Sequence, residues 1–124
     1  MSSEKEKDPH GIDAKVAGAK LDAGKTPVFR GAVDYFPRAL TKVAGVSFAG
    51  AQKYTWKGWE SVPDGINRYS DAAMRHRVKQ SIEGPYDLDF LNALPPQKIL
   101  HLAQIAWNDL AVLELYLREH PEEM

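Results

Sequence analysis

The feature that most constrains the fold is a long apolar segment near the C-terminal end of the chain. It follows Pro95-Pro96 and is predicted to form a helix that runs to about Glu119. Its apolar residues are Ile99, Leu100, Leu102, Ala103, Ile105, Ala106, Trp107, Leu110, Val112, Leu113, Leu115 and Leu117. They lie on nearly every side of the helix, and such a helix has to be covered on several sides. We therefore expect it at the centre of a bundle or at a subunit interface.

A polar seam interrupts this apolar helix. His101, Gln104 and Asn108 recur at i, i+3 and i+7, so they share one face. A buried polar group without a partner costs roughly 1 to 3 kcal/mol, so the seam requires partners. Hydrogen bonds between helices would provide them, but three polar side chains in one stripe favour the wall of a pocket.

Two further helices complete the predicted fold. One spans about residues 35 to 54, where apolar residues recur at helical spacing, although small residues near 47 to 50 allow a break. The other starts after Asp64 as its N-cap and ends at Glu83-Gly84-Pro85. No alternation typical of strands is sustained and no repeat occurs. The prediction is an all-α bundle of about three to four helices, with its core completed by dimerisation.

The middle helix presents charged side chains at helical spacing. Arg68, Asp71 and Arg75 fall at i, i+3 and i+7 on one face, and His76 lies on an adjacent face. Two guanidinium groups around a carboxylate suit the joint binding of a polyanion and a metal ion. An exposed ladder of salt bridges has the same spacing and is common on helices, so spacing alone favours that reading.

Composition excludes several classes of function. The 124 residues carry a net charge of -1 and a pI near 6.4, so no basic excess supports general nucleic-acid or membrane-surface binding. The absence of cysteine excludes disulfides, thiolate zinc sites and thiol nucleophiles. No apolar run approaches the roughly 18 to 20 residues that cross a bilayer, and the N-terminus lacks the core of a signal peptide. We therefore predict a cytoplasmic protein.

The N-terminal part of the chain has a different composition. Residues 1–20 mix charges with small residues and are predicted to form a flexible arm, whereas residues 21–120 form a single helical domain. Lys25 follows a turn that lacks the glycines of a phosphate-binding P-loop, so an ordinary loop is the simpler interpretation.

Other candidate residues lie at the ends of helices and in loops. Lys53 and Tyr54 end the first predicted helix, and Trp59 follows in an aromatic turn, where it could stack on a flat ligand or, more commonly, cover the edge of the core. Asp87 and Asp89 flank a leucine and could converge on a magnesium ion, although they serve more often as turn residues.

The sequence between residues 21 and 118 resembles the phage-associated dATP/dGTP diphosphohydrolase family. The segments that carry the resemblance are Leu21-Asp22-Ala23-Gly24-Lys25, Pro37-Arg38-Ala39-Leu40, Gly50-Ala51-Gln52-Lys53-Tyr54, Gly58-Trp59, Val62-Pro63-Asp64-Gly65, Arg68-Tyr69, Asp71-Ala72, Arg75-His76, His101-Leu102-Ala103 and Ala106-Trp107-Asn108. The resemblance implies an all-α, MazG-like nucleotide pyrophosphohydrolase of phage nucleotide metabolism. Such an enzyme cuts a purine deoxynucleoside triphosphate between the α and β phosphates with Mg2+, giving the monophosphate and pyrophosphate.

The resemblance also implies roles for the candidate residues. His76 and His101 are the expected catalytic residues, and Asp71, Asp87 and Asp89 are the expected ligands of magnesium. The expected substrate-binding residues are Lys25, Lys53, Tyr54, Trp59, Arg68, Arg75, Gln104 and Asn108. The expected partners are a purine triphosphate and further copies of the chain in a homodimer or larger oligomer.

Two departures from similar sequences leave alternatives open. Gln104 stands where those sequences carry a second histidine, and the chain lacks the Glu-Glu-x-x-Glu helix that binds magnesium in better-known MazG enzymes. One alternative is a non-catalytic protein of the same fold that sequesters a nucleotide or signalling nucleotide, as an anti-defence protein would. Another is a helical interaction module without a small ligand. A convergent carboxylate cluster with room for a metal would favour catalysis.

Overall fold

The computed structural model describes residues 5–124, which fall into two compact units divided between Tyr35 and Phe36. In the first unit the Asp8 carboxylate accepts hydrogen bonds from the backbone N–H groups of His10 and Lys20, both at 2.7 Å. A short π-helix, η1 (Phe29–Val33), lies near the end of this unit. The first four residues of the predicted N-terminal arm lie outside the described part of the chain.

The second unit is helical, which confirms the predicted all-α class. Its long helices are α1 (Pro37–Lys53), α2 (Gly65–Glu83) and α4 (His101–Glu119), and its short elements are η2 (Gly58–Ser61), α3 (Leu88–Leu91) and η3 (Pro121–Glu123). Within residues 5–124 there is no strand, only an isolated bridge between Tyr86 and Leu100. No helix in this range is long and apolar enough to cross a membrane.

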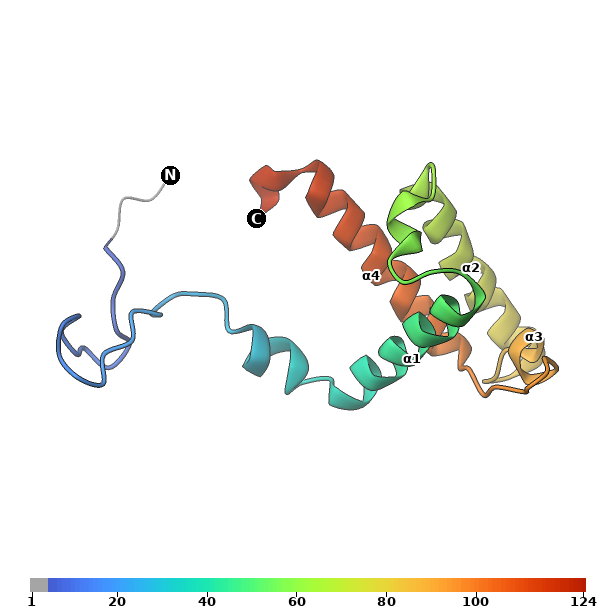
Figure 1. The fold of residues 1–124 in the computed structure, drawn as a ribbon, viewed down its shortest axis with the longest axis horizontal. Coiled ribbons are helices and arrows are strands. Elements are labelled where there is room, and N and C mark those ends of the chain that lie inside the picture. Colours follow the sequence, from blue (N-terminus) through green and yellow to red (C-terminus); the bar gives the residue numbers. More distant parts are fainter. Residues whose placement is uncertain (1–4) are drawn as a thin grey trace. The chain divides into compact units, whose positions relative to one another are not determined.

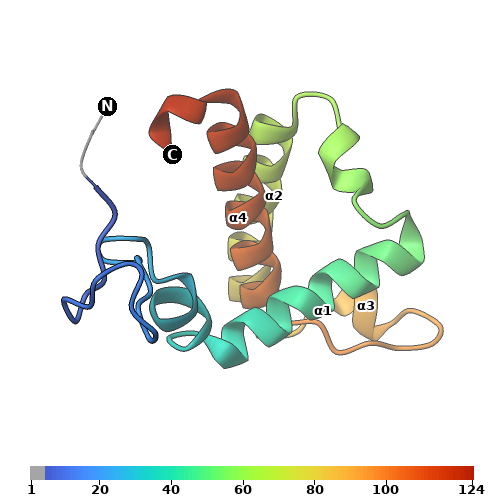
Figure 2. The ribbon, with the colours of Figure 1, turned by 60° about the vertical axis from the view of Figure 1, so that its left-hand side comes forward.

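Helices α2 and α4 form an antiparallel pair and pack along their length, while α1 packs against α4 (Figures 1 and 2). Small side chains allow the close approach, because Ala73, Ala103 and Ala111 are among the buried positions. Gly65, at the start of α2, also lies close to α4: a Cβ atom there would lie 2.8 Å from Leu115 Cδ1, so the leucine side chain would have to shift.

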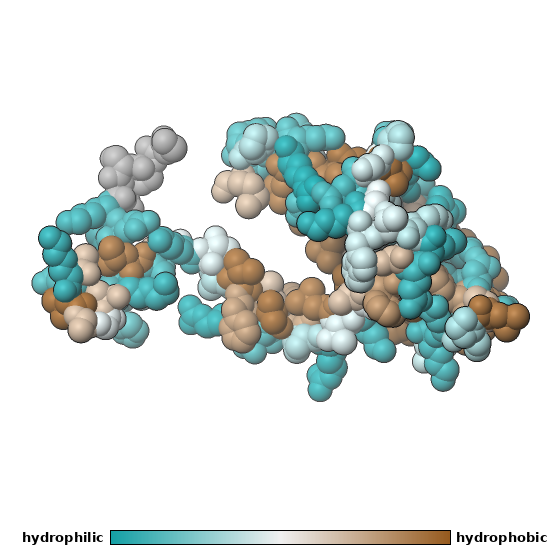
Figure 3. Space-filling model, in the orientation of Figure 1, coloured by the Kyte–Doolittle hydropathy of each residue, from teal (hydrophilic) through white to brown (hydrophobic). Residues whose placement is uncertain are grey.

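Within the second unit, one face of the apolar helix α4 stays uncovered. Leu102, Leu110 and Leu113 keep 50%, 46% and 53% of their surface exposed, which is compatible with the predicted position at a subunit interface. Figure 3 shows apolar side chains at the surface over part of α4. Dimerisation through this face stays a prediction.

Several predicted boundaries differ from the observed ones. Helix α4 begins at His101 and not directly after Pro96, because the preceding segment is extended: Asp87 N–H donates to Ile99 O and His101 N–H donates to Pro85 O, both at 2.9 Å. Helix α1 is continuous through residues 47–50. The predicted loop around Leu88 contains the single turn of α3, which Asp87 caps by accepting from Asp89 N–H.

Asp64 occupies the predicted N-cap position of α2 but acts differently from the prediction. Its backbone is left-handed, with φ of 54°, and its side chain makes no hydrogen bond to the backbone of the first turn. It accepts instead from the side-chain amide of Asn67, at 3.0 Å.

Candidate functional site

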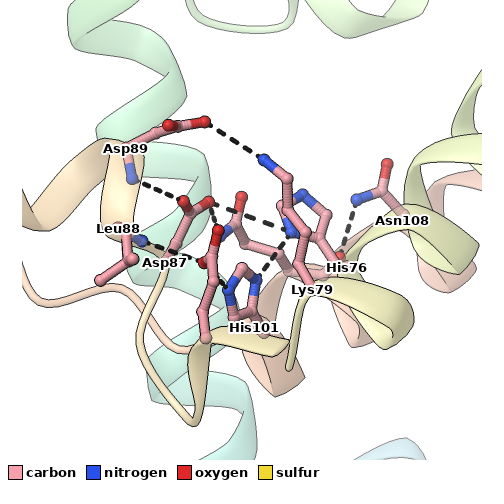
Figure 4. A network of polar contacts seen from close by, with 9 residues as sticks. His76, Lys79, Asp87, Leu88, Asp89, His101 and Asn108 are labelled. Atoms are coloured by element: carbon pink, nitrogen blue, oxygen red, sulfur yellow. Dashed lines mark hydrogen bonds and ion pairs between the residues drawn. The ribbon is translucent and has the colours of Figure 1, made fainter. Parts of the chain in front are cut away.

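A buried cluster of titratable side chains lies where α2 ends and α4 begins. His76 and Glu83 come from α2, Asp87 from the loop before α3, and His101 from the first residue of α4 (Figure 4). His76 and Glu83 are seven residues apart, so both lie on the same face of α2. Gly84 ends the helix with φ of 89°, a conformation that suits glycine, and the chain then returns to bring Asp87 to the cluster.

His101 is the centre of the cluster and is fully buried. Its Nε2 lies 2.6 Å from the Glu83 Oε2, and its Nδ1 lies 3.0 Å from the Nδ1 of His76. A carboxylate can only accept a hydrogen bond, so the first contact places a proton on His101 Nε2. A neutral His101 therefore presents the lone pair of Nδ1 to His76.

Asp87 provides a second carboxylate to the cluster, beside that of Glu83, and is only 3% exposed. Its Oδ2 accepts a hydrogen bond from Gln104 Nε2 at 2.8 Å, and its Oδ1 accepts from Asp89 N–H at 3.0 Å. Burial raises the pKa of Asp87, but these two hydrogen bonds and the nearby imidazoles outweigh burial and bring the pKa below its ordinary value. Asp87 is therefore a carboxylate at neutral pH.

His76 links the cluster to the surface. Its Nδ1 lies 3.9 Å from Asp87 Oδ2, and its side chain retains 17% of its exposure. Burial lowers the pKa of His76 below its ordinary value, against the opposing effect of Asp87. The imidazole is therefore neutral at neutral pH and can donate a lone pair.

Basic side chains border the cluster along α2. Lys79 lies one turn after His76 and forms an ion pair with Asp89 at 3.2 Å, a contact that raises the pKa of Lys79. Arg75 precedes Lys79 by four residues and is exposed, so the two cations are neighbours on the helix surface. We call Arg68, Arg75 and Lys79 the basic stripe.

Comparison with known families identifies the chain. The family model for the N-terminal part of dATP/dGTP diphosphohydrolases matches residues 15–124, which include the whole cluster and the basic stripe. The chain belongs to this family. No curated protein and no solved structure matches it. The resemblance inferred from the sequence motifs is therefore confirmed at the level of the family.

In this member of the dATP/dGTP diphosphohydrolase family, several predicted site residues come together. His76, His101, Asp87 and Gln104 are joined by the contacts described above, and Asp89 lies at the edge of the cluster. The side-chain amide of Asn108 donates to Gln104 O at 2.7 Å, so the buried polar seam of α4 is hydrogen-bonded. Among the described residues, no buried side-chain nitrogen or oxygen lacks a partner.

Other predicted site residues lie outside this cluster. Asp71 is exposed on α2, together with Arg68, which donates to Pro63 O at 3.2 Å. Lys53 lies 5.5 Å from the ring of Tyr54 at the end of α1. Lys25 belongs to the first unit, where it pairs with Glu6 at 3.0 Å.

Trp59 takes part in an aromatic cluster. Its ring meets those of Tyr69 and Trp107 edge to face, at centroid distances of 6.2 and 6.0 Å. Trp59 and Trp107 also line a groove of about 270 Å³ between α1 and α4, together with Val43, Ser47, Leu110, Ala111 and Glu114. Trp59 therefore both packs against the core and borders an open groove.

Two residues of the site were not predicted from the sequence. Glu83 was interpreted as the end of a helix and as the start of an acidic segment, without a role in the site, and Lys79 was not singled out. Their spacing contained a signal, because they follow His76 by seven and three residues and so share its face of α2. That signal becomes informative only once this face is known to pack against α4.

The cluster contains one convergent set of potential metal ligands. One atom each of His76, Asp87 and His101 lies within 4.8 Å of the other two. Among residues 5–124, this is the group of three histidine or acidic residues whose potential ligand atoms lie this close together. Magnesium strongly prefers oxygen ligands, whereas two of these three atoms are imidazole nitrogens. The set therefore does not fit the Mg2+ that the sequence resemblance implies.

Proposed function

We propose that the protein hydrolyses purine deoxynucleoside triphosphates, dATP and dGTP, to the monophosphate and pyrophosphate. The observation that carries this proposal is the buried imidazole and carboxylate cluster beside the basic stripe, in a chain that belongs to the dATP/dGTP diphosphohydrolase family. Because the sequence resembles a phage-associated family, we further propose a role in phage nucleotide metabolism.

The basic stripe is suited to binding the triphosphate. Hydrolysis of a triphosphate depends mainly on positioning and on neutralising the negative charge of the phosphates. Arg75 and Lys79 lie on the surface of α2 beside His76, where guanidinium and ammonium groups can reach phosphate oxygens. We propose that substrate phosphates displace the exposed Asp89 carboxylate from Lys79.

The groove along α4 is suited to the purine. Trp107 follows His101 by six residues, so it lies about 9 Å further along the helix at about 1.5 Å per residue. Because the rings of Trp59 and Trp107 contact each other edge to face, we propose that the purine binds in the groove against their open sides and not between them, with its phosphates extending along α4 towards the cluster. Aromatic side chains bind flat bases by stacking, which accounts for a role of Trp59 in substrate binding.

The buried cluster supplies groups for the chemical step. A water oxygen bonds to the α-phosphorus while the bond to the oxygen bridging to the β-phosphorus breaks, and pyrophosphate leaves. The water must lose a proton, and in the metal-free cluster the neutral imidazole of His76 and the Asp87 carboxylate are acceptors at neutral pH.

The uncovered face of α4 supports assembly into a homodimer or larger oligomer. Three leucines on one helix remain about half exposed, and a second copy of this face would bury them. Contact between the apolar faces of α4 in two copies would cover this helix on several sides, as its sequence predicts.

The proposal is tested by incubating the protein with each of dATP, dGTP, dCTP, dTTP, ATP and GTP in the presence of Mg2+ or Mn2+. Released pyrophosphate and the thermal unfolding midpoint are measured together. We expect pyrophosphate from the purine deoxynucleotides at a higher kcat/KM than from the others. If a nucleotide raises the midpoint without turnover, the protein sequesters nucleotides instead. If neither changes, the hydrogen-bonded cluster is a structural feature of an interaction module.

A further inference from the structure

We propose that His76, Asp87 and His101 form a binding site for a divalent transition-metal ion, such as Mn2+, Fe2+, Co2+ or Zn2+, and not for Mg2+. The ion's part in turnover rests on the proposed function, whereas its binding does not. The ligand atoms are Nδ1 of each histidine and Oδ2 of Asp87.

The positions of the protons in the cluster leave lone pairs that a cation can bind. Glu83 lies 2.6 Å from His101 Nε2 and holds a proton there, so His101 Nδ1 carries a lone pair. This lone pair faces His76 Nδ1 at 3.0 Å, and the negative Oδ2 of Asp87 lies on the same side at 3.9 Å from His76 Nδ1. Either a proton on His76 Nδ1 or a bound cation must separate these electron-rich atoms. The carboxylate adds the negative charge that favours a divalent cation.

Two of the three separations between the ligand atoms suit coordination to one ion, and the third is below 4.8 Å. Two nitrogens bound at about 2.1 Å and at an angle of about 90° are about 3.0 Å apart. The observed separation of the two Nδ1 atoms is 3.0 Å. The 3.9 Å between His76 Nδ1 and Asp87 Oδ2 is shorter than the about 4.2 Å of two ligands on opposite sides of such an ion.

Surrounding residues hold two of the three ligands, His101 and Asp87, as they do in known metal sites. A histidine that binds a metal usually donates its other ring N–H to a carboxylate or carbonyl, and Glu83 accepts from His101 in this way. Gln104 and the Asp89 amide orient the Asp87 carboxylate through 2.8 and 3.0 Å hydrogen bonds. Glu83 and Gln104 are therefore positioning residues for the metal site.

The identity of the donors decides the class of metal. Imidazole binds the later first-row ions well, whereas Mg2+ keeps its water ligands and prefers carboxylate and phosphate oxygens. Three protein ligands leave further coordination positions for water or for phosphate oxygens. The partly exposed side chain of His76 places these positions on the side of the basic stripe.

The binding test uses untagged full-length protein that has been stripped with a chelator and dialysed. Co2+ is added while visible absorption is recorded, and isothermal titration gives the stoichiometry. We expect one Co2+ per chain, no displacement by a large excess of Mg2+, and displacement by one equivalent of Zn2+. His76→Ala and Asp87→Asn are expected to weaken binding by more than 100-fold, and Glu83→Gln by about 10- to 100-fold.

The matched control removes the remaining histidines of the sequence. A His10→Ala/His120→Ala double variant should bind Co2+ as the unchanged protein does, because neither residue belongs to the cluster. Circular dichroism establishes that each variant is folded. A further measurement needs no variant: substoichiometric Mn2+ should broaden the imidazole resonances of His76 and His101 in the unchanged protein and leave those of His10 and His120 sharp.

The proposal is overturned if the protein binds Co2+ no more tightly than folded His76→Ala does, if Mg2+ competes at equal concentration, or if Mn2+ broadens all four histidines alike. These results are separable from those of the nucleotide test. Turnover with Mg2+ but no tight Co2+ binding would remove the metal site and keep the proposed function. Tight Co2+ binding without turnover of any nucleotide would keep the metal site and remove the proposed function.

Discussion

Replacement of Glu83 tests whether the contact with His101 organises the cluster. Glu83→Ala removes an acceptor that lies 2.6 Å from Nε2 of a fully buried imidazole and 3.2 Å from Leu88 N–H. Hydrogen bonds to charged groups contribute about 1.5 to 3 kcal/mol, and the weaker contact to Leu88 adds little, so we expect a loss of about 2 to 3 kcal/mol. Glu83→Gln keeps an acceptor but removes the charge, so we expect about 1 kcal/mol.

The measurement is urea unfolding followed by circular dichroism, with a chelator present so that bound metal does not contribute to stability. In a thermal unfolding experiment on the same variants, a loss of 1 kcal/mol corresponds to a decrease of about 4 to 8 °C in the midpoint temperature for a unit of this size. Glu119→Ala, an exposed residue at the end of α4, is the control and should change stability by less than about 0.5 kcal/mol. If Glu83→Ala behaves like this control, the cluster is not organised by the Glu83–His101 contact.

Three further predictions concern the substrate, the helix packing and the assembly. Arg75→Ala should raise the KM for dGTP by about 10-fold or more through loss of a phosphate contact worth at least ~1.4 kcal/mol. Arg77→Ala, on another face of α2, should leave this KM unchanged. If steady-state kinetics gave equal effects for the two variants, the basic stripe would not be the phosphate site. Gly65→Ala should lower the free energy of unfolding by about 1 to 2 kcal/mol in urea unfolding, because its Cβ would lie 2.8 Å from Leu115 Cδ1 on α4. Gly45→Ala, with no atom within 4 Å, should instead stabilise α1 by up to about 1 kcal/mol. If both variants changed the free energy of unfolding in the same direction, the close approach of α2 to α4 at Gly65 would be contradicted. Leu113→Asp should convert an oligomer to monomers in light scattering, and an unchanged mass would show that this face is not the interface.

The sequence was sufficient to predict the helices because their signals are local. The apolar spacing of α1 and α4 and the turn residues around α2 gave the all-α class with boundaries close to those observed. The start of α4 was missed because it depends on contacts between residues distant in sequence: Pro85 and Asp87 pair with the segment before His101 and keep it extended. Local helical preference favours continuing the helix back to Pro96, and this pairing overrides it.

The candidate site was predictable in part for the same reason. The polar seam of α4 required partners, and the structure shows that His76 on α2 is one of them, although the sequence did not indicate which residue would face the seam. The expected role of Asp71 came from its spacing with the arginines, but spacing does not say which face of α2 packs against α4. That face proved to contain Ala73, His76 and Glu83, so Asp71 is exposed. The role of Glu83 likewise depends on the position of α4.

The central claim is that the buried cluster is the reaction centre, and Asp87→Asn tests it most directly. An asparagine in this place can still accept from the Asp89 amide through Oδ1 and, after the Gln104 amide rotates, donate through Nδ2 to Gln104 Oε1, so the fold should persist, but it lacks the negative charge. We predict that kcat for dGTP, measured as pyrophosphate release at saturating substrate, falls by at least about 100-fold, or roughly 2.7 kcal/mol. Asp109→Asn, an exposed carboxylate on α4, should leave kcat unchanged. A folded Asp87→Asn protein that turns over dGTP at the original rate would contradict the claim.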